Sequence, residues 1–184
     1  MSPMRDDLES VLLSEEQIKQ RLDELAAEIA RDYAGRDLTV VGILTGSMIF
    51  IADLVRRLPI RLRLDYIGAS SYHGETRSKG ELIITRALKL DVRDRDILVI
   101  DDILDTGLTL VKIREMLQKF QPRSVKCCTL LEKDVPHQEN FRADYVAFQI
   151  PNRFVVGYGL DYRERYRNLP YVGVLRPEAI AATT

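Results

Sequence analysis

Three aspartates follow an apolar run within a short stretch of the chain, and their spacing indicates a binding site. Asp101 and Asp102 come directly after the apolar residues Leu98–Ile100, and Asp105 follows within the same stretch. Clustered carboxylates cost stability unless cations or hydroxyl-rich ligands lie beside them. We therefore expect these three side chains to gather at one chain turn and to bind hydroxyl groups or a cation there.

The residues that follow Asp105 favour binding of an anion. Thr106, Gly107, Leu108 and Thr109 are predicted to open an amphipathic helix, where backbone N–H groups have no helical partner. These N–H groups, the two threonine hydroxyls and the helix dipole all favour a phosphate at this position. Carboxylates beside a phosphate-binding helix start together indicate a sugar phosphate as the ligand.

Helices and strands that position this motif follow from the apolar periodicity. The capping-box pattern at 14–17 predicts a first helix that ends near Gly35. The glycine- and serine-rich segment 68–80 is predicted to be a mobile loop. Two more helices are predicted, over 48–58 and around 110–120, and strands are predicted over 38–44, 61–67, 81–88, 96–100, 124–131, 145–150, 154–158 and 171–175.

This order of elements is typical of a mostly parallel central sheet with helices on both faces, which is an α/β fold. Ligands of such sheets bind outside the carboxyl ends of the strands, where the acidic motif lies. We predict one domain over residues 1–184, with a core at about 36–150. A small hood subdomain is expected from the N-terminal segment and the residues after 150.

Composition narrows the class of protein and of partner. The 27 basic and 28 acidic residues leave a formal net charge of −1, so no global field attracts nucleic acid or acidic lipid. The N-terminus has no secretory pattern, and no apolar run approaches the roughly 20 residues that span a bilayer. We predict a cytoplasmic protein with no membrane or nucleic-acid partner.

Cysteines and histidines give no further site. Cys127 and Cys128 are adjacent in a predicted strand, where neighbouring side chains point to opposite faces. This geometry suits neither a disulfide nor a shared metal, so both are interpreted as buried strand residues. His73 and His137 have no partner at metal-ligand spacing and are interpreted as loop histidines.

The stretch LVIDDILDTGLTL at 98–110 resembles the phosphoribosyl pyrophosphate signature of the type I phosphoribosyltransferases. Lys133, the block FVVGYGLDY at 154–162 and the run Arg167-Asn168-Leu169 narrow the resemblance to the hypoxanthine-guanine phosphoribosyltransferases. It extends from about Leu38 to Leu175. It implies transfer of ribose 5-phosphate from phosphoribosyl pyrophosphate to N9 of hypoxanthine or guanine, which gives IMP or GMP and pyrophosphate.

The resemblance assigns roles to the acidic motif. Asp101 and Asp102 match residues that bind the ribose hydroxyls, directly or through Mg²⁺, which is the implied cofactor. Asp105 matches a carboxylate that faces N7 of the base and acts as the general acid or base. The residues from Thr106 to Thr109 match the 5-phosphate cradle.

The resemblance assigns further roles to residues that follow the acidic motif in the sequence. Lys133 matches the donor to the purine 6-oxo group, and an ammonium cannot accept from a 6-amino group. Phe154 matches a residue that stacks on the purine, and the Val155 backbone matches a contact to the purine 2-position. Asp161 matches a ligand of a magnesium ion that also binds pyrophosphate, and Arg167 matches a basic contact to that leaving group.

Two more segments match the family. Thr45 and Gly46 lie where the family binds pyrophosphate through backbone amides, often after a non-proline cis peptide. Some members have a basic residue at the Thr45 position, and its absence here leaves the backbone as the expected contact. Ser71 and Tyr72 match a loop that closes over the active site and excludes water.

Several alternatives stay open at this stage. A xanthine-preferring relative differs in backbone geometry that a sequence does not display, and a phosphoribosyl pyrophosphate-sensing regulator that binds nucleic acid shares the fold. Without the resemblance, Phe154 fits a core aromatic, Asp161 a surface acceptor, Arg167 a solvent-facing charge run, and Tyr72 loop packing. The resemblance also implies a homodimer or homotetramer.

Overall fold

A computed structural model of the protein describes residues 3–71, 82–137 and 141–181. The elements, in chain order, are η1 Pro3–Arg5, β1 Leu8–Leu13, α1 Glu15–Asp32, β2 Leu38–Leu44, α2 Met48–Val55, β3 Leu62–Ser71, β4 Leu82–Arg86, β5 Asp96–Leu104, α3 Leu108–Gln118, β6 Ser124–Lys133, β7 Tyr145–Ile150, β8 Val155–Val156, β9 Val172–Leu175 and α4 Pro177–Ala181. None of the helices in these ranges is both long enough and apolar enough to cross a membrane.

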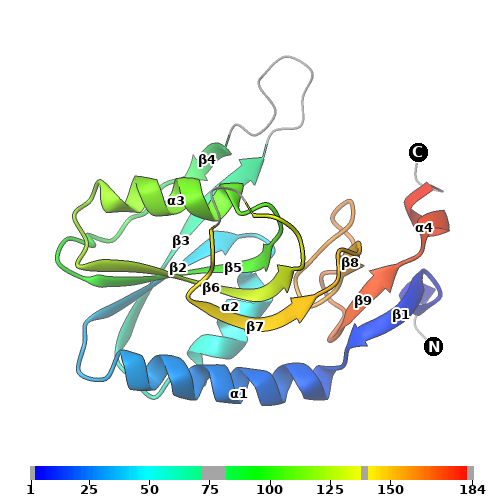
Figure 1. The fold of residues 1–184 in the computed structure, drawn as a ribbon, viewed down its shortest axis with the longest axis horizontal. Helices are drawn as coiled ribbons and strands as arrows, with labels where there is room; N and C mark the ends of the chain where they lie inside the picture. Colours follow the sequence, from blue (N-terminus) through cyan, green and yellow to red (C-terminus); the bar gives the residue numbers. More distant parts are fainter. Residues whose placement is uncertain (1–2, 72–81, 138–140, 182–184) are drawn as a thin grey trace.

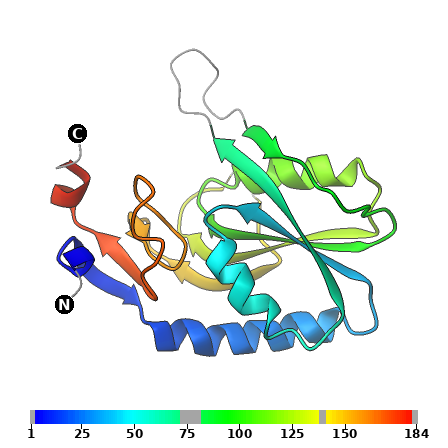
Figure 2. The ribbon, with the colours of Figure 1, turned by 180° about the vertical axis from the view of Figure 1, so that it is seen from behind.

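The larger sheet has six strands in the order β4-β3-β2-β5-β6-β7. All neighbouring strands run parallel except β4, which pairs antiparallel with β3 at the edge. Helix α3 covers one face of this sheet, and α1 and α2 cover the other (Figures 1 and 2). The predicted α/β class with a mostly parallel central sheet is confirmed.

Alternating residues of the central strands face two separate hydrophobic cores. Val40 on β2 belongs to the core under α1 and α2, whereas its neighbour Val41 belongs to the core under α3. The same alternation separates Cys128 from Cys127 on β6, and both thiols are fully buried and free. The expectation that these cysteines point to opposite faces is therefore confirmed.

The first helix begins where the sequence predicts. The Gln17 backbone N–H donates to Ser14 Oγ over 3.2 Å, and the Ser14 N–H donates to Gln17 Oε1 over 2.8 Å. This reciprocal capping satisfies two backbone donors that the helix itself leaves free. The buried face of α1 carries Ile18, Leu22, Leu25, Ala26 and Ile29.

A smaller sheet forms the hood, in the order β1-β9-β8 with antiparallel pairing. It joins the two ends of the described chain, which lie side by side at one end of the molecule (Figures 1 and 2). Leu8, Val156 and Leu175 contribute to its own hydrophobic core. The sequence analysis does not predict β1, in which the three successive residues Glu9, Ser10 and Val11 are exposed.

Several predicted boundaries differ from those in the structure, and two of these errors, both beside the site, have the same physical cause. The predicted strand 96–100 continues as β5 to Leu104, because its parallel partner β6 continues to Lys133 and pairs with it. The acidic pair therefore lies inside a strand and not at a turn. Residues Gly68–Ser71, predicted as part of a loop, extend β3 because β4 pairs with them. The rest of the predicted loop, 72–80, lies outside the described residues.

Candidate active site

Asp101 and Asp102 occupy the carboxyl-terminal half of β5, in the middle of the sheet. Asp101 is only 8% exposed and its Oδ1 accepts from the Asp102 backbone N–H over 3.0 Å. Asp102 Oδ1 in turn accepts from the Ile103 N–H over 2.9 Å. Backbone N–H groups of β5 thus fix the carboxylates of these two adjacent residues near the carboxyl ends of the parallel strands.

Burial disfavours negative charge on this acidic pair. It raises the pKa of Asp101 well above the ordinary range, and the neighbouring Asp102 carboxylate raises it further. Burial also raises the pKa of Asp102, against the lowering effect of its hydrogen bonds and of the charge on Arg167. Hydroxyl donors or a cation would stabilise the charged forms, so the pair is suited to bind either.

The loop between β2 and α2 runs directly against Asp102. A Cβ atom on Gly46 would lie 1.8 Å from Asp102 Oδ2, so only glycine lets the backbone approach this carboxylate. The peptide bond Leu44–Thr45 is cis, as the family resemblance implies. Ser47 closes the loop, because its buried hydroxyl donates to the Ile43 carbonyl oxygen.

The start of α3 supplies the anion-binding geometry. Gly107, at the N-cap, has a φ of +85°, a left-handed conformation that favours glycine. The helix itself begins at Leu108, one turn after Asp105, and its first turn carries no acidic residue. The Leu108 N–H lies 3.5 Å from Thr106 Oγ1, and the first N–H groups of the helix have no partner within the helix.

These segments enclose a cavity of about 580 Å³. It is lined by Ile43, Leu44, Thr45, Gly46, Ala69, Asp101, Asp102, Ile103, Leu104, Asp105, Thr106, Gly107, Leu108, Thr109, Leu110, Asp161 and Arg167. The cavity thus brings together eleven of the residues predicted to form the site, from three separate parts of the chain. They are Thr45, Gly46, Asp101, Asp102, Asp105, Thr106, Gly107, Leu108, Thr109, Asp161 and Arg167.

Lys133 reaches this cavity through Asp105. It ends β6, its side chain is 13% exposed, and its Nζ lies 2.9 Å from Asp105 Oδ2. It also borders a neighbouring cavity of about 430 Å³. The largely buried Lys133 ammonium and the Asp105 carboxylate, whose side chain is 51% exposed, therefore lie side by side at the rim of the cavity.

His137 is a site residue that the sequence analysis missed. Its Nδ1 lies 2.6 Å from the Asp105 carbonyl oxygen, and its Nε2 lies 3.1 Å from Glu132 Oε1. A carbonyl oxygen only accepts, so Nδ1 carries the hydrogen in this contact. His137 lies in a loop, as predicted, but this loop returns it to Asp105, and no local sequence pattern signals that contact.

Asp161 and Arg167 form the hood side of the cavity. Arg167 pairs with Asp161 over 2.9 Å and also donates to the Gly159 carbonyl oxygen over 2.9 Å. The Glu164 N–H donates to the second Asp161 oxygen over 2.9 Å. Arg167 is therefore held by the hood and faces the cavity, in contrast to a fully solvated charge run.

Like Lys133, the predicted base contacts Phe154 and Val155 are not among the residues that line this cavity. Phe154 is 46% exposed and packs edge-on against Tyr162, with ring centroids 5.5 Å apart. Val155 is buried in β8. Ser71 ends β3, two residues beyond Ala69, which does line the cavity, and Tyr72 lies outside the described residues.

Comparisons with known proteins agree with this geometry. The family model of the phosphoribosyl transferase domain matches residues 10–163. A hypoxanthine-guanine phosphoribosyltransferase from Staphylococcus aureus is 48% identical over 175 residues, which cover 95% of this chain and 98% of the relative. The enzyme of that name from Staphylococcus epidermidis is 49% identical over the same shares. A crystal structure of a hypoxanthine phosphoribosyltransferase from Staphylococcus aureus superposes with a TM-score of 0.91, at 48% identity and 96% coverage of each chain.

Proposed function

Because the chain belongs to the phosphoribosyl transferase domain family, we propose that it is a purine-salvage enzyme acting on hypoxanthine and guanine. It transfers ribose 5-phosphate from phosphoribosyl pyrophosphate to N9 of the base and releases pyrophosphate. The products are IMP and GMP. The observation that carries this proposal is the 2.9 Å contact between Lys133 Nζ and Asp105 Oδ2 at the rim of the acidic cavity.

This pair of side chains matches one edge of a 6-oxopurine. The 6-oxo group and N7 project from the same edge of the ring system. An ammonium donates to the oxo group and cannot accept from a 6-amino group, so Lys133 selects against adenine. The adjacent Asp105 carboxylate then faces N7, where it accepts the proton that the base loses.

The sugar phosphate binds along the cavity from the acidic pair to the helix start. Asp101 and Asp102 accept from the ribose hydroxyls. The 5-phosphate lies against the N–H groups and hydroxyls from Thr106 to Thr109, where the α3 dipole favours an anion. Both ends of the sugar are thereby fixed before the reaction, which lowers the entropy cost of the transition state.

In the reaction, a bond forms between N9 and C1 of the ribose as the bond from C1 to the pyrophosphate oxygen breaks. The electron pair of the broken bond leaves with pyrophosphate, and the base transfers its N7 proton to Asp105. Backbone amides of Thr45 and Gly46 and the Arg167 guanidinium hold the leaving group. The exposed ring of Phe154 stacks on the purine, and the Val155 backbone contacts its 2-position.

Magnesium fits the donors of this cavity. Within the described ranges, no three His, Cys, Asp or Glu side chains are grouped so that they hold a metal by themselves. Mg²⁺ usually binds one or two carboxylates together with substrate phosphate oxygens, and Asp161 and the Asp101–Asp102 pair offer such carboxylates on one cavity. When bound, the ion neutralises charge on the leaving pyrophosphate.

The same proposal covers location and assembly. The enzyme works in the cytoplasm as a homodimer or homotetramer and has no nucleic-acid partner. The formal net charge of −1 supports the last point, because a nucleic-acid-binding regulator requires a basic surface.

A panel of bases tests the proposed function. The full-length protein is incubated with phosphoribosyl pyrophosphate, Mg²⁺ and, in turn, hypoxanthine, guanine, xanthine, adenine, orotate or uracil, and pyrophosphate release is measured. We expect turnover with hypoxanthine and guanine. Reaction of adenine, orotate or uracil without reaction of the 6-oxopurines would overturn the assignment. Preference for xanthine would support the xanthine-specific relative, and tight RNA retention without turnover would support a regulator.

A further inference from the structure

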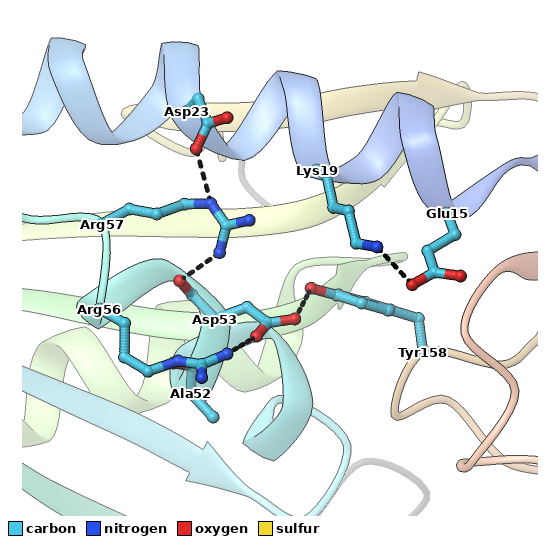
Figure 3. Close-up of polar contacts among 8 residues, drawn as sticks. All are labelled: Glu15, Lys19, Asp23, Ala52, Asp53, Arg56, Arg57 and Tyr158. Atoms are coloured by element: carbon cyan, nitrogen blue, oxygen red, sulfur yellow. Dashed lines mark hydrogen bonds and ion pairs between the residues drawn. The ribbon is translucent and has the colours of Figure 1, made fainter.

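A polar cluster ties the hood to α2 (Figure 3). The Tyr158 hydroxyl donates to Asp53 Oδ2 over 2.6 Å, and the other Asp53 oxygen pairs with Arg56. Burial raises the pKa of Tyr158, and the hydrogen bond to Asp53 raises it further, so the phenol keeps its proton and donates. Tyr158 is only 5% exposed, so water competes little for this contact.

The hood backbone at Tyr158 has an unusual conformation. Gly157, Tyr158 and Gly159 have φ angles of 99°, 51° and 104°. Glycine adopts such angles readily, but a tyrosine does so only where surrounding contacts hold it. The Tyr158 N–H donates to the Leu169 carbonyl oxygen, and the side-chain hydroxyl is the second polar attachment of this residue.

This segment of the hood lies directly against the loop that follows β2. A Cβ atom on Gly159 would lie 2.1 Å from the Gly46 carbonyl oxygen, so the two backbones are in contact. The Gly159 N–H donates to the Arg167 carbonyl oxygen over 2.9 Å, and Arg167 Nη1 donates back to the Gly159 carbonyl oxygen. Any displacement of residues 157–159 would therefore move both Gly46 and Arg167.

Asp53 and Tyr158 each lie in a chain segment that continues to residues on the pyrophosphate side of the cavity. Asp53 lies on α2, which begins at Met48 immediately after Thr45–Ser47. On the hood side, Asp161 follows Tyr158 by three positions in the same chain segment. The hydrogen bond thus connects the two parts of the chain that line the cavity on either side of the expected leaving group.

The remainder of the cluster anchors α2 to α1. Arg57 Nε donates to Asp23 Oδ1 over 2.8 Å, and Arg57 Nη1 donates to the Asp53 carbonyl oxygen over 2.8 Å. Asp23 lies on α1, on the side of the cluster that faces away from Tyr158 (Figure 3). Asp23 offers a matched control for Asp53, because it is also an aspartate of this cluster but takes no part in the link to the hood.

We propose that Tyr158 and Asp53 are positioning residues that set the spacing between the Thr45–Gly46 loop and the hood residues Asp161 and Arg167. This inference rests on the proposed function, in which these two groups of residues hold pyrophosphate. The base contacts Lys133 and Asp105 belong to other elements, β6 and the loop after β5. The base contacts of the hood, Phe154 and Val155, are held separately by the pairing of β8 with β9 and by the hydrogen bond from the Leu175 N–H to the Phe154 carbonyl oxygen. Loss of the hydroxyl therefore weakens binding of phosphoribosyl pyrophosphate and leaves purine binding unchanged.

The test compares Tyr158→Phe, Asp53→Ala, Asp53→Asn and Asp23→Asn with the unmodified protein. Steady-state KM values are measured for phosphoribosyl pyrophosphate and for hypoxanthine at saturating Mg²⁺. For Tyr158→Phe and Asp53→Ala we expect the KM for phosphoribosyl pyrophosphate to rise about threefold to tenfold, the range that one net hydrogen bond gives. The KM for hypoxanthine should stay within about twofold, because Lys133 and Asp105 lie on other elements and β9 holds Phe154 and Val155. Asp53→Asn keeps an acceptor oxygen and should restore most of the loss, and Asp23→Asn should match the unmodified protein.

Equal rises in both KM values, or no change in either, would overturn the inference and leave Tyr158 with a role in stability alone. The same conclusion follows if Asp23→Asn behaves like Tyr158→Phe. If Tyr158→Phe does not fold, the pair Asp53→Ala and Asp53→Asn decides the question. Failure of the unmodified protein to use any 6-oxopurine would instead refute the proposed function, before any variant is compared.

Discussion

Asp101 and Asp105 lie four positions apart and have opposite surroundings. Asp101 is 8% exposed, and burial raises its pKa, whereas the Asp105 side chain is 51% exposed and pairs with Lys133. A buried carboxyl fixed by the strand suits the binding of hydroxyl groups. An exposed carboxylate beside a cation suits exchange of a proton with a ligand at the rim.

This difference predicts the effect of Asp105→Asn. Asparagine keeps the size of the side chain and an acceptor oxygen for Lys133 but does not take a proton. We expect kcat to fall by about 100-fold or more, the usual contribution of a general base, while the KM for phosphoribosyl pyrophosphate changes by no more than about threefold. Steady-state kinetics with hypoxanthine measures both. Asp134→Asn, at an exposed position next to Lys133, is the control for simple loss of negative charge. Unchanged kcat in Asp105→Asn would remove it from proton handling.

Sequence alone identified the acidic residues but not their neighbour His137. The motif from Asp101 to Thr109 is continuous along the chain, so its chemistry is visible in the residue types. The contact between His137 and Asp105 joins positions 32 apart and exists because β5 and β6 are parallel neighbours. Nothing local to His137 encodes it.

At the scale of elements, the bounds of several strands are set by the strands that pair with them and not by the apolar periodicity of their own residues. β5 keeps its extended backbone through Asp101 and Asp102 because β6 pairs alongside. A prediction based on apolar runs stops at Ile100, where the apolar residues stop. The hood strand β1 is a stronger example, because its partner β9 lies at the opposite end of the chain. Helix α1, by contrast, carries its own cap and apolar stripe and was predicted from local sequence.

A single buried carboxylate fixes the segment after β4 to β3. Asp65 accepts from the backbone N–H groups of Lys89 over 2.6 Å and Leu90 over 2.9 Å, and it pairs with Arg86 over 3.0 Å. Burial acts to raise the pKa of Asp65. The backbone hydrogen bonds, from Leu90, Tyr66 and Lys89, together with Arg86 outweigh this effect, so the pKa is lowered overall.

Asp65→Asn is therefore expected to destabilise the fold in a pH-dependent way. A pKa that is lower in the folded state contributes stability above the unfolded value of about 3.9, and this contribution is lost as the pH falls through the folded value. We expect the substitution to cost about 2 kcal/mol of unfolding free energy near pH 7 and less at about pH 3. Urea denaturation across this range measures the difference. Asp91→Asn, at an exposed position, should show no such trend. A cost that stays constant with pH would contradict the role given to the Asp65 charge.

At the scale of the whole molecule, the hood strands face two hydrophobic cores. Val155, Val172 and Val174 join the core under α1 and α2, whereas Leu8 and Leu175 belong to a separate core on the other side of the hood. Leu8 on β1 is 4% exposed and packs against this core and against Gly173. Only a few strands and the short helix α4 surround it. The side of the hood that carries Leu8 is therefore expected to open locally at a lower free energy than the large sheet.

Leu8→Ala tests this division. Removal of a buried leucine side chain costs about 2 to 5 kcal/mol in the region that it stabilises. We expect hydrogen exchange to accelerate in β8 and β9, while amides of β2 and β5 keep their protection. Val11→Ala, on the same strand but 41% exposed, should leave exchange unchanged. Acceleration spread evenly over both sheets would show that they unfold as one unit.

The class of the large sheet followed from the alternation of strand and helix patterns, whereas the arrangement of the hood did not. Parallel strands with helical connections leave few possible topologies. The hood combines Leu8–Leu13 with Val155–Val156 and Val172–Leu175, three short strands with no regular spacing. These strands associate only when the two ends of the chain come together, so no short stretch of sequence contains the information that predicts their pairing.

Cys127 and Cys128 make the protein well suited to site-directed labelling. Both thiols are fully buried on opposite faces of β6, and burial raises the pKa of Cys127 to about 12. Burial raises the pKa of Cys128 as well. A maleimide dye requires an accessible thiolate, so the native cysteines should not react with it in the folded protein. A cysteine introduced at an exposed position, for example in place of Arg163 on the hood, would carry a fluorophore selectively and report hood movement without removal of either native residue.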